Sequence, residues 1–388
     1  MWIPRYSENL FRRMAKQFPA VIVTGARQAG KTSLLHRMIP QASYLSLDLP
    51  ANAEAARTAP EQLLEQYPSP VIIDEIQYAP SLLRHLKYRI DKNRSPGQYF
   101  LTGSQVFQLM QGVSESLAGR CGILNLHTLS RAELLAAGRP IEEASYVFLG
   151  GYPELHVGAE AVLWFPAYVA TYLERDVRNV LRVVDLQDFN RFVRACALRT
   201  SQVLNYSDIA RDTGVAPNTA RKWVGLLQSS AVVSLIEPYW GNRTKRLIKA
   251  PKLVFLDTGL AAFLSGFRSE EALFSSSLAG AFWESHVFGQ ILRQDASRGE
   301  AAVLHYWRTA NGAEVDLVIE QAGGMAIAVE CKWKEHPDIA DAAGLRALEA
   351  VEKDRIKGKF ILCRTKASYK LTDGTSVMNV TQFLERKK

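Results

Sequence analysis

The eight residues from Gly25 to Thr32 read Gly-Ala-Arg-Gln-Ala-Gly-Lys-Thr and fit the pattern Gly-x4-Gly-Lys-Ser/Thr at every fixed position. This pattern is typical of a loop whose backbone N–H groups surround the β-phosphate of ATP at the amino end of a helix. The lysine then neutralises phosphate charge and the threonine hydroxyl ligates Mg²⁺. The expected nucleotide-binding residues are Gly25, Ala26, Arg27, Gln28, Ala29, Gly30, Lys31, Thr32 and Ser33.

Two acidic residues, Asp74 and Glu75, directly follow the apolar run 71–73. An acid at the carboxyl end of a parallel strand faces the crevice in which nucleotides bind. We therefore expect Asp74 to hold the Mg²⁺ shell and Glu75 to position and polarise the attacking water. A second acid suited to water indicates hydrolysis rather than transfer to another substrate, although a solvated strand end is the alternative.

Hydroxyl side chains mark the end of a further apolar run, Leu101-Thr102-Gly103-Ser104. A hydroxyl at this edge of the sheet is suited to sensing the γ-phosphate. Thr102 and Ser104 are both candidates, and Ser104 is included with Lys31 and Glu75 among the predicted catalytic residues.

A second set of candidate residues lies near the end of the chain. Asp316 belongs to an alternating segment, 311–319, and Glu330-Cys331-Lys332 ends the next apolar run. Period-two geometry puts Glu330 and Lys332 on one face, so Asp316 and Glu330 are predicted to bind Mg²⁺ while Lys332 orients a water for phosphodiester attack. Glu284, in a helical stretch, is a candidate third acid. Amphipathic strand ends often carry such charges, which is the competing interpretation.

The segments that must position the first site alternate between strands and helices. Strands are predicted over 20–24, 44–47, 71–73 and 99–102, separated by helix-length segments. This order predicts βαβ units and a parallel sheet. From about 130 to 186 the pattern is helical, with a turn at Gly150-Gly151.

A basic segment follows the helical one. Between Arg191 and Leu260 there are eleven Lys or Arg and four Asp or Glu, which gives +7 of the net charge of +8. Segments 207–215 and 218–227 fit a helix-turn-helix, and the strand 232–239 with the turn Gly241-Asn242 completes a winged-helix outline. The expected DNA contacts are Asn218, Arg221, Lys222, Arg243, Lys245 and Arg246. A solvated basic face, or packing between domains, is the alternative.

The chain resembles a family of bacterial and archaeal AAA-type ATPases in which a P-loop domain precedes a C-terminal domain of unknown function, DUF4143. The resemblance rests on blocks in order at 24–32, 73–77, 101–104, 116–120, 150–154 and 255–260. Ala26 departs from it, because proline is expected there, and should only loosen the loop. By the resemblance Arg120 is the candidate arginine finger, reaching a neighbouring subunit in a homo-oligomer, plausibly a hexamer; a surface ion pair is the alternative.

The expected fold is a multidomain α/β protein. Length, at about 150 residues per domain, predicts two or three domains. We expect an AAA+-like P-loop core at 1–130, a helical lid at 131–187, a winged helix at 188–250 and a restriction-endonuclease-like domain at 251–388. The last assignment rests on a second resemblance, to the PD-(D/E)xK superfamily, which carries an acid, then Glu-x-Lys, on a hairpin after an acid-bearing helix.

The expected function is ATP hydrolysis that requires Mg²⁺ and acts on DNA, double-stranded or branched, with a candidate metal-dependent nuclease at the C-terminal end. A nucleotide-dependent signalling or assembly switch with protein partners competes with it, and a phosphotransferase is third. No run of about 18 apolar residues and no Cys-x-x-Cys pair occurs. A cytoplasmic location without membrane contact is therefore expected.

Overall fold

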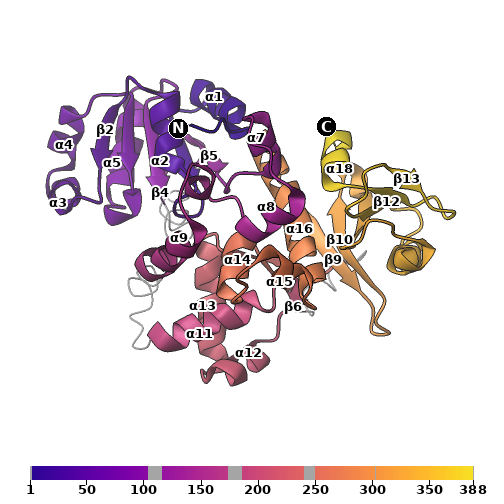
Figure 1. The fold of residues 1–388 in the computed structure, drawn as a ribbon. Helices are drawn as coiled ribbons and strands as arrows, with labels where there is room; N and C mark the ends of the chain where they lie inside the picture. The colour runs from indigo at the N-terminus through magenta and orange to yellow at the C-terminus, as the bar shows by residue number, and fades with distance from the viewer. Residues whose placement is uncertain (1, 104–115, 174–185, 240–249, 302, 388) are drawn as a thin grey trace.

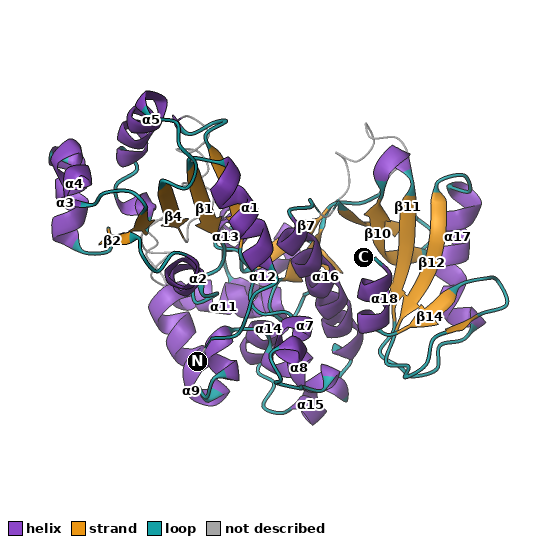
Figure 2. Cartoon of the chain, turned by 90° about the horizontal axis from the view of Figure 1, so that it is seen from above, coloured by secondary structure: helices purple, strands orange, loops and turns teal. Residues whose placement is uncertain are grey.

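The structure is a computed structural model that describes residues 2–103, 116–173, 186–239, 250–301 and 303–387. Two sheets lie at opposite ends of the molecule, and helices from the middle of the chain fill the space between them (Figure 1). The view from above shows the same division, with strands at both ends and helices across the centre (Figure 2).

The first sheet has five parallel strands in the order β2-β3-β4-β1-β5. They are β1 (Ala20–Thr24), β2 (Ser43–Ser46), β3 (Val71–Asp74), β4 (Tyr99–Gly103) and β5 (Cys121–Asn125). Ala20 and Ile22 of β1 join one hydrophobic core, and Val21 and Val23 join another. Both faces are therefore covered, which is typical of parallel sheets. This parallel sheet with its phosphate-loop motif is the P-loop NTPase fold.

Helices cover this sheet on both sides. They are α1 (Ser7–Gln17), α2 (Lys31–Met38), α3 (Pro50–Thr58), α4 (Pro60–Gln66) and α5 (Leu82–Lys92), with the 3₁₀ turn η1 (Ile76–Tyr78). Leu82, Leu86 and Ile90 bring α5 onto one face, because residues at this spacing form one stripe of a helix. Phe11 of α1 and Leu34 of α2 pack on the other face.

The stretch predicted to be helical contains α7 (Arg131–Ala136), α8 (Glu143–Leu149), η2 (Pro153–His156), α9 (Ala161–Tyr168), the π-helical η3 (Val169–Leu173) and then α11 (Leu186–Ala197). The predicted turn lies between α8 and η2. Gly150 has φ 77°, and a Cβ there would lie 2.0 Å from a carboxylate oxygen of Asp257. Glycine is required at this turn because the two segments touch.

The basic segment folds as a helix-turn-helix followed by strands. Helices α12 (Tyr206–Thr213) and α13 (Pro217–Ser229) flank Gly214, which has φ 76°. The strands β6 (Gln202–Val203), β7 (Val233–Ile236) and β8 (Lys252–Phe255) form an antiparallel sheet in the order β6-β8-β7. The predicted boundary at residue 250 thus separates β8 from the sheet to which it belongs.

The second large sheet has six strands in the order β13-β14-β12-β11-β10-β9. They are β9 (Leu304–Arg308), β10 (Glu314–Glu320), β11 (Ala326–Cys331), β12 (Ile356–Leu362), β13 (Tyr369–Lys370) and β14 (Ser376–Met378). Its helices are α14 (Thr258–Leu264), α15 (Glu270–Phe274), α16 (Ala279–Arg298), α17 (Ala343–Val351) and α18 (Val380–Arg386), with short turns η5 (Ala322–Gly324) and η6 (Ile339–Ala342). Alternate residues of β10 pack toward opposite cores, Leu317 with α16 and Val318 with α17.

Among the described helices, none combines the length and the apolar character needed to cross a bilayer.

Candidate nucleotide-binding site

The loop between β1 and α2 has the backbone shape that its glycines allow. Gly25 has φ 135°, and a Cβ there would lie 2.0 Å from the carbonyl oxygen of Leu126. Gly30 has φ 92° and forms the N-cap of α2. Both positions therefore favour glycine, and the loop leads into the first turn of α2, where the N–H groups have no acceptor within the helix itself.

Lys31 lies over this loop. Its ammonium group donates to the carbonyl oxygens of Gly25 at 3.1 Å and Ala26 at 2.9 Å, and the residue is buried. A lysine held here can neutralise phosphate charge above the loop, as predicted from the motif.

Thr32 and Asp74 meet at the carboxyl end of the sheet. The Thr32 hydroxyl donates to Asp74 Oδ1 at 2.9 Å, and the Tyr44 hydroxyl donates to Asp74 Oδ2 at 2.8 Å. Burial and the hydrogen bond to Asp74 raise the pKa of Tyr44 to about 12. Hydroxyl and carboxylate oxygens are the ligands that Mg²⁺ prefers, so the two residues brought together fit the ion of a bound nucleotide.

Glu75 occupies a conformation that is uncommon for a residue with a side chain. Its φ is 57° and ψ 51°, in the left-handed region, where a non-glycine residue costs about 1–3 kcal/mol. Its N–H donates to the Thr102 hydroxyl at 3.0 Å, and the Gln77 amide donates to its carboxylate. Neighbours thus hold the predicted water-activating residue in a strained position beside Asp74.

Thr102 connects both acids. Its hydroxyl donates to Asp74 Oδ1 and accepts from the N–H of Glu75. Of the two hydroxyl candidates, Thr102 is therefore hydrogen-bonded to both Asp74 and Glu75. Ser104 lies outside the described residues.

Arg120 lies at the opposite edge of the same sheet. It precedes Cys121, which pairs with Ala20 at the amino end of β1. Its guanidinium binds both carboxylate oxygens of Asp91, at 2.6 Å and 2.9 Å. The structure does not bring Arg120 to the phosphate-binding loop of its own chain, and the contact that it shows is the ion pair that was the alternative interpretation.

The C-terminal candidates converge near the end of β11. Lys332 Nζ lies 2.7 Å from Glu330 Oε1, and the Cys331 N–H donates to Asp316 Oδ2 at 2.7 Å. Glu284 comes from α16 on the covered face of the sheet. Burial and the nearby Asp316 charge raise the pKa of Glu330 to about 8, and its Oε2 atom has no hydrogen-bond partner among the described residues.

A fourth acid and a lysine that the sequence did not indicate complete this cluster. Lys252 of β8 is 2% exposed, and its Nζ lies 2.8 Å from Glu284, 2.5 Å from Glu314 and 3.9 Å from Asp316. Burial lowers the pKa of Lys252, but the surrounding carboxylates outweigh burial and raise it, so the lysine is charged. We call Lys252, Glu284, Glu314 and Asp316 the lysine-centred cluster.

A metal ion does not fit the lysine-centred cluster in this arrangement. Between Glu284 and Asp316 lies an ammonium group, which would repel a divalent cation. Across the ranges that the structure describes, no group of three or more His, Cys, Asp or Glu is arranged to hold a metal. Metal binding by Glu284, Asp316 and Glu330 therefore stays a prediction. It would require the ammonium group of Lys252 to move away from Glu284 and Asp316.

Three family models match successive segments of the chain. The family model described as "AAA domain" matches residues 17–135, and the model "Domain of unknown function (DUF4143)" matches 279–383. Between them, "Domain of unknown function (DUF8612)" matches 142–271. The uncharacterized proteins Rv2008c of Mycobacterium tuberculosis and Mb2031c of Mycobacterium bovis are each 31% identical over 317 residues, 80% of this chain and 70% of the relative. The chain belongs to this family of AAA-domain proteins with a C-terminal DUF4143 domain.

Solved structures are more distant from this AAA–DUF4143 protein. The Walker-type ATPase PABY2304 of Pyrococcus abyssi is 15% identical, with a TM-score of 0.45 over 66% of this chain and 94% of that one. AMPPCP-bound DnaA from Aquifex aeolicus is 12% identical, with a TM-score of 0.30 over 57% and 85%.

The predicted DNA-contacting residues of the AAA–DUF4143 protein fall into two groups. Asn218, Arg221 and Lys222 are exposed on α13, whose opposite side carries buried Val224 and Leu227. The Arg221 guanidinium lies 5.2 Å from the centre of the Tyr206 ring. Arg243, Lys245 and Arg246 lie outside the described residues.

Proposed function

We propose that this AAA–DUF4143 protein hydrolyses ATP with Mg²⁺. The observation that carries the proposal is the hydrogen-bonded group Thr32, Asp74, Thr102 and Glu75 beside the phosphate-binding loop. Thr32 and Asp74 would hold the ion, which withdraws charge from the phosphates, and Lys31 would neutralise the β- and γ-phosphates. Glu75 would orient the attacking water and accept its proton.

Two variants test this assignment. Lys31→Ala should lose ATP binding, whereas Glu75→Gln should retain ATP affinity and lose turnover by about 10²-fold or more, because only the glutamate acts on water. Nucleotide affinity and steady-state turnover of the purified variants are the measurements. Turnover of Glu75→Gln at the wild-type rate would remove the proposed role.

The proposed substrate of the ATP-driven motion is double-stranded or branched DNA. The helix-turn-helix with its antiparallel sheet supports a winged helix, and exposed Arg221 and Lys222 support phosphate contact by α13. DNA-stimulated ATP turnover is the test, and turnover that DNA does not change would contradict it.

A second candidate is a nucleotide-dependent assembly switch whose C-terminal modules bind proteins. The buried contacts of Lys252 support a structural role for this module, because they join its antiparallel sheet to α16 and the C-terminal sheet, so that a change in one part can reach the other. DNA-independent turnover combined with a nucleotide-dependent change of assembly state would support the switch.

For the C-terminal module we propose the restriction-endonuclease-like fold but no cleavage step in the arrangement described. Helix α16 followed by the antiparallel strands β9, β10 and β11 supports the fold. The lysine-centred cluster argues against bound metal, so DNA cutting by the wild-type protein with Mg²⁺ or Mn²⁺ would contradict this part of the proposal.

A further inference from the structure

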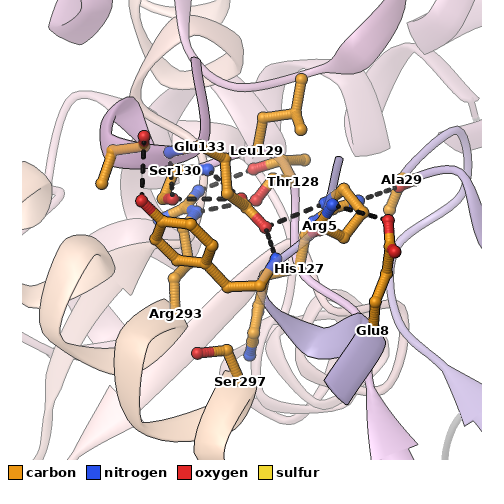
Figure 3. Close-up of polar contacts among 12 residues, drawn as sticks. Arg5, Glu8, Ala29, His127, Thr128, Leu129, Ser130, Glu133, Arg293 and Ser297 are labelled. Carbon is orange, nitrogen blue, oxygen red and sulfur yellow. Dashed lines mark hydrogen bonds and ion pairs between the residues drawn. The ribbon is translucent and has the colours of Figure 1, made fainter. Parts of the chain in front are cut away.

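Arg5, which precedes α1, reaches the phosphate-binding loop. Its Nη1 donates to the carbonyl oxygen of Ala29 at 3.0 Å, its Nη2 to the carbonyl oxygen of His127 at 2.6 Å, and its Nε to Glu133 Oε1 at 3.1 Å. Figure 3 shows the guanidinium between the loop on one side and α7 on the other. The residue is 7% exposed, and its contacts with Ala29 and Glu133 are buried.

The contact with Ala29 fixes the direction of a donor in the loop. The peptide group that joins Ala29 to Gly30 is planar, and in the trans form its C=O and N–H point in opposite directions. An arginine that holds the Ala29 oxygen therefore turns the Gly30 N–H away from itself. That N–H precedes α2 and belongs to the group of loop donors that surrounds phosphate in this motif.

The charge on Arg5 strengthens the same donor. A guanidinium hydrogen bond to a carbonyl oxygen polarises the peptide group, which makes its N–H a better donor to an anion. No part of this effect requires Arg5 to touch the nucleotide. Arg5 acts through the backbone of the loop, and is a positioning residue.

Glu133 holds Arg5 on the side away from the loop. Glu133 Oε1 also accepts the backbone N–H of Tyr6 at 2.8 Å, and Glu133 Oε2 accepts the Ser130 N–H at 2.7 Å. The ion pair is buried, with side-chain exposures of 5% for Arg5 and 6% for Glu133. The contact with Glu133 fixes the orientation of the Arg5 guanidinium. Because Glu133 belongs to α7, this helix is linked through Arg5 to the Ala29 carbonyl of the loop.

We propose that Arg5 presets the phosphate-binding loop for ATP, with the Gly30 N–H aimed at the β-phosphate before the nucleotide arrives. The inference rests on the proposed ATP binding and adds a residue outside the Gly-x4-Gly-Lys-Thr motif to it. A preset donor contributes equally to the bound substrate and to the transition state. Loss of Arg5 therefore weakens ATP binding without slowing the chemical step.

The test compares Arg5→Ala and Arg5→Lys with Arg12→Ala. Arg12 is a matched control, because it is an arginine of α1 whose exposed side chain pairs with Glu8 at 3.3 Å. We expect Arg5→Ala to raise KM for ATP and Kd for a fluorescent ADP by about tenfold, the equivalent of one charge-assisted hydrogen bond, with kcat within about twofold. Arg5→Lys should recover part of the affinity, and Arg12→Ala should match the wild type.

A second measurement separates this inference from the proposed hydrolysis. Amide hydrogen exchange of the segment 25–34, in protein without nucleotide, should be faster in Arg5→Ala than in the wild type and unchanged in Arg12→Ala. If the wild type neither binds nor hydrolyses ATP, the proposed function is wrong. The exchange difference would still show whether Arg5 orders the loop, because it is measured without nucleotide. Wild-type Kd and exchange in Arg5→Ala, with only a lower melting temperature, would overturn the positioning role. Should Arg5→Ala not fold, Arg5→Lys carries the same comparison.

Discussion

At the scale of single residues, Lys252 is a buried charge that joins two sheets. It is buried among three carboxylates and belongs to a different sheet from Glu314 and Asp316. Removing one partner of a buried ion pair is costly, because the charges left behind have neither water nor a counterion.

We predict that Lys252→Met, which keeps most of the side-chain length and removes the charge, destabilises the protein by about 3–5 kcal/mol. Urea unfolding measures the change. The matched control is Lys222→Met on the exposed side of α13, which should change stability by no more than about 0.5 kcal/mol. Addition of Mn²⁺ should stabilise Lys252→Met and leave the wild type unchanged. If Mn²⁺ raises the melting temperature of the wild type, and Asp316→Ala removes that rise, the claim that the lysine-centred cluster excludes a metal ion is contradicted.

Glu330 gives a second prediction at this scale. Its pKa is raised by burial and by Asp316 to about 8 in the folded protein. The folded state therefore holds a proton that the unfolded chain releases near pH 4.5, so stability is lost as the pH rises between these values. Glu330→Gln, which is neutral throughout, should show a smaller loss of unfolding free energy between about pH 5 and 8. Equal pH profiles for the variant and the wild type would show that Glu330 is not the group responsible.

Sequence patterns indicated which residues meet around the phosphate-binding loop better than which residues meet near the end of β11, for a local reason. Within the loop 25–32, Lys31 contacts Gly25 and Ala26, so this part of the site depends on residues that are close in the sequence. The lysine-centred cluster brings together residues 252, 284, 314 and 316 through three elements. In the sequence Lys252 belongs to the basic segment, and only its place in the run Lys-Leu-Val-Phe indicates that it is buried.

At the scale of elements, the predicted bounds of a strand agree best with the structure where the apolar pattern in the sequence is strongest. The strand predicted over 20–24 is β1 unchanged, because its β-branched apolar residues are buried throughout. The strand predicted over 232–239 ends at Ile236. Pro238 lacks the N–H that a continuing ladder needs and instead forms an isolated bridge with Tyr306 of β9. The left-handed backbone of Glu75 had no local signal at all.

Helix α13 carries the element-scale prediction. Arg221→Ala combined with Lys222→Ala should weaken DNA binding and reduce the slope of log affinity against log salt by roughly one unit for each phosphate that the variant no longer neutralises. Binding is measured across a salt series. Arg211→Ala is the control, because Arg211 lies on α12 and pairs with Asp208 at 3.1 Å. An unchanged slope in the double variant would favour packing as the role of this module.

At the scale of the whole molecule, the predicted arginine-finger role of Arg120 requires a second copy of the chain. It lies at the edge of the sheet opposite the phosphate-binding loop, paired with Asp91. An arginine finger from this position acts only on a neighbouring copy.

We therefore predict that ATP induces a homo-oligomer, plausibly a hexamer, and that turnover per chain rises with protein concentration. Arg120→Ala should bind ATP normally and lose turnover by about 10³-fold or more. Light scattering with ATP and a concentration series are the measurements. Arg94→Ala is the control, because Arg94 donates to the carbonyl oxygen of Gly119 at 2.8 Å and so contacts the same turn. A monomer with full activity would reduce Arg120 to the partner of Asp91.

The contribution of β8 to the C-terminal module bears on how this protein can be divided for study. The DUF4143 match begins at residue 279, whereas Lys252 and the whole of β8 precede it. A fragment cut at 279 would expose Glu284, Glu314 and Asp316 to each other without their counterion, and would unfold more readily as the pH rises. A fragment that begins before β6 keeps the lysine and its sheet. An inactive or insoluble short fragment would thus reveal where it was cut, not what the domain does.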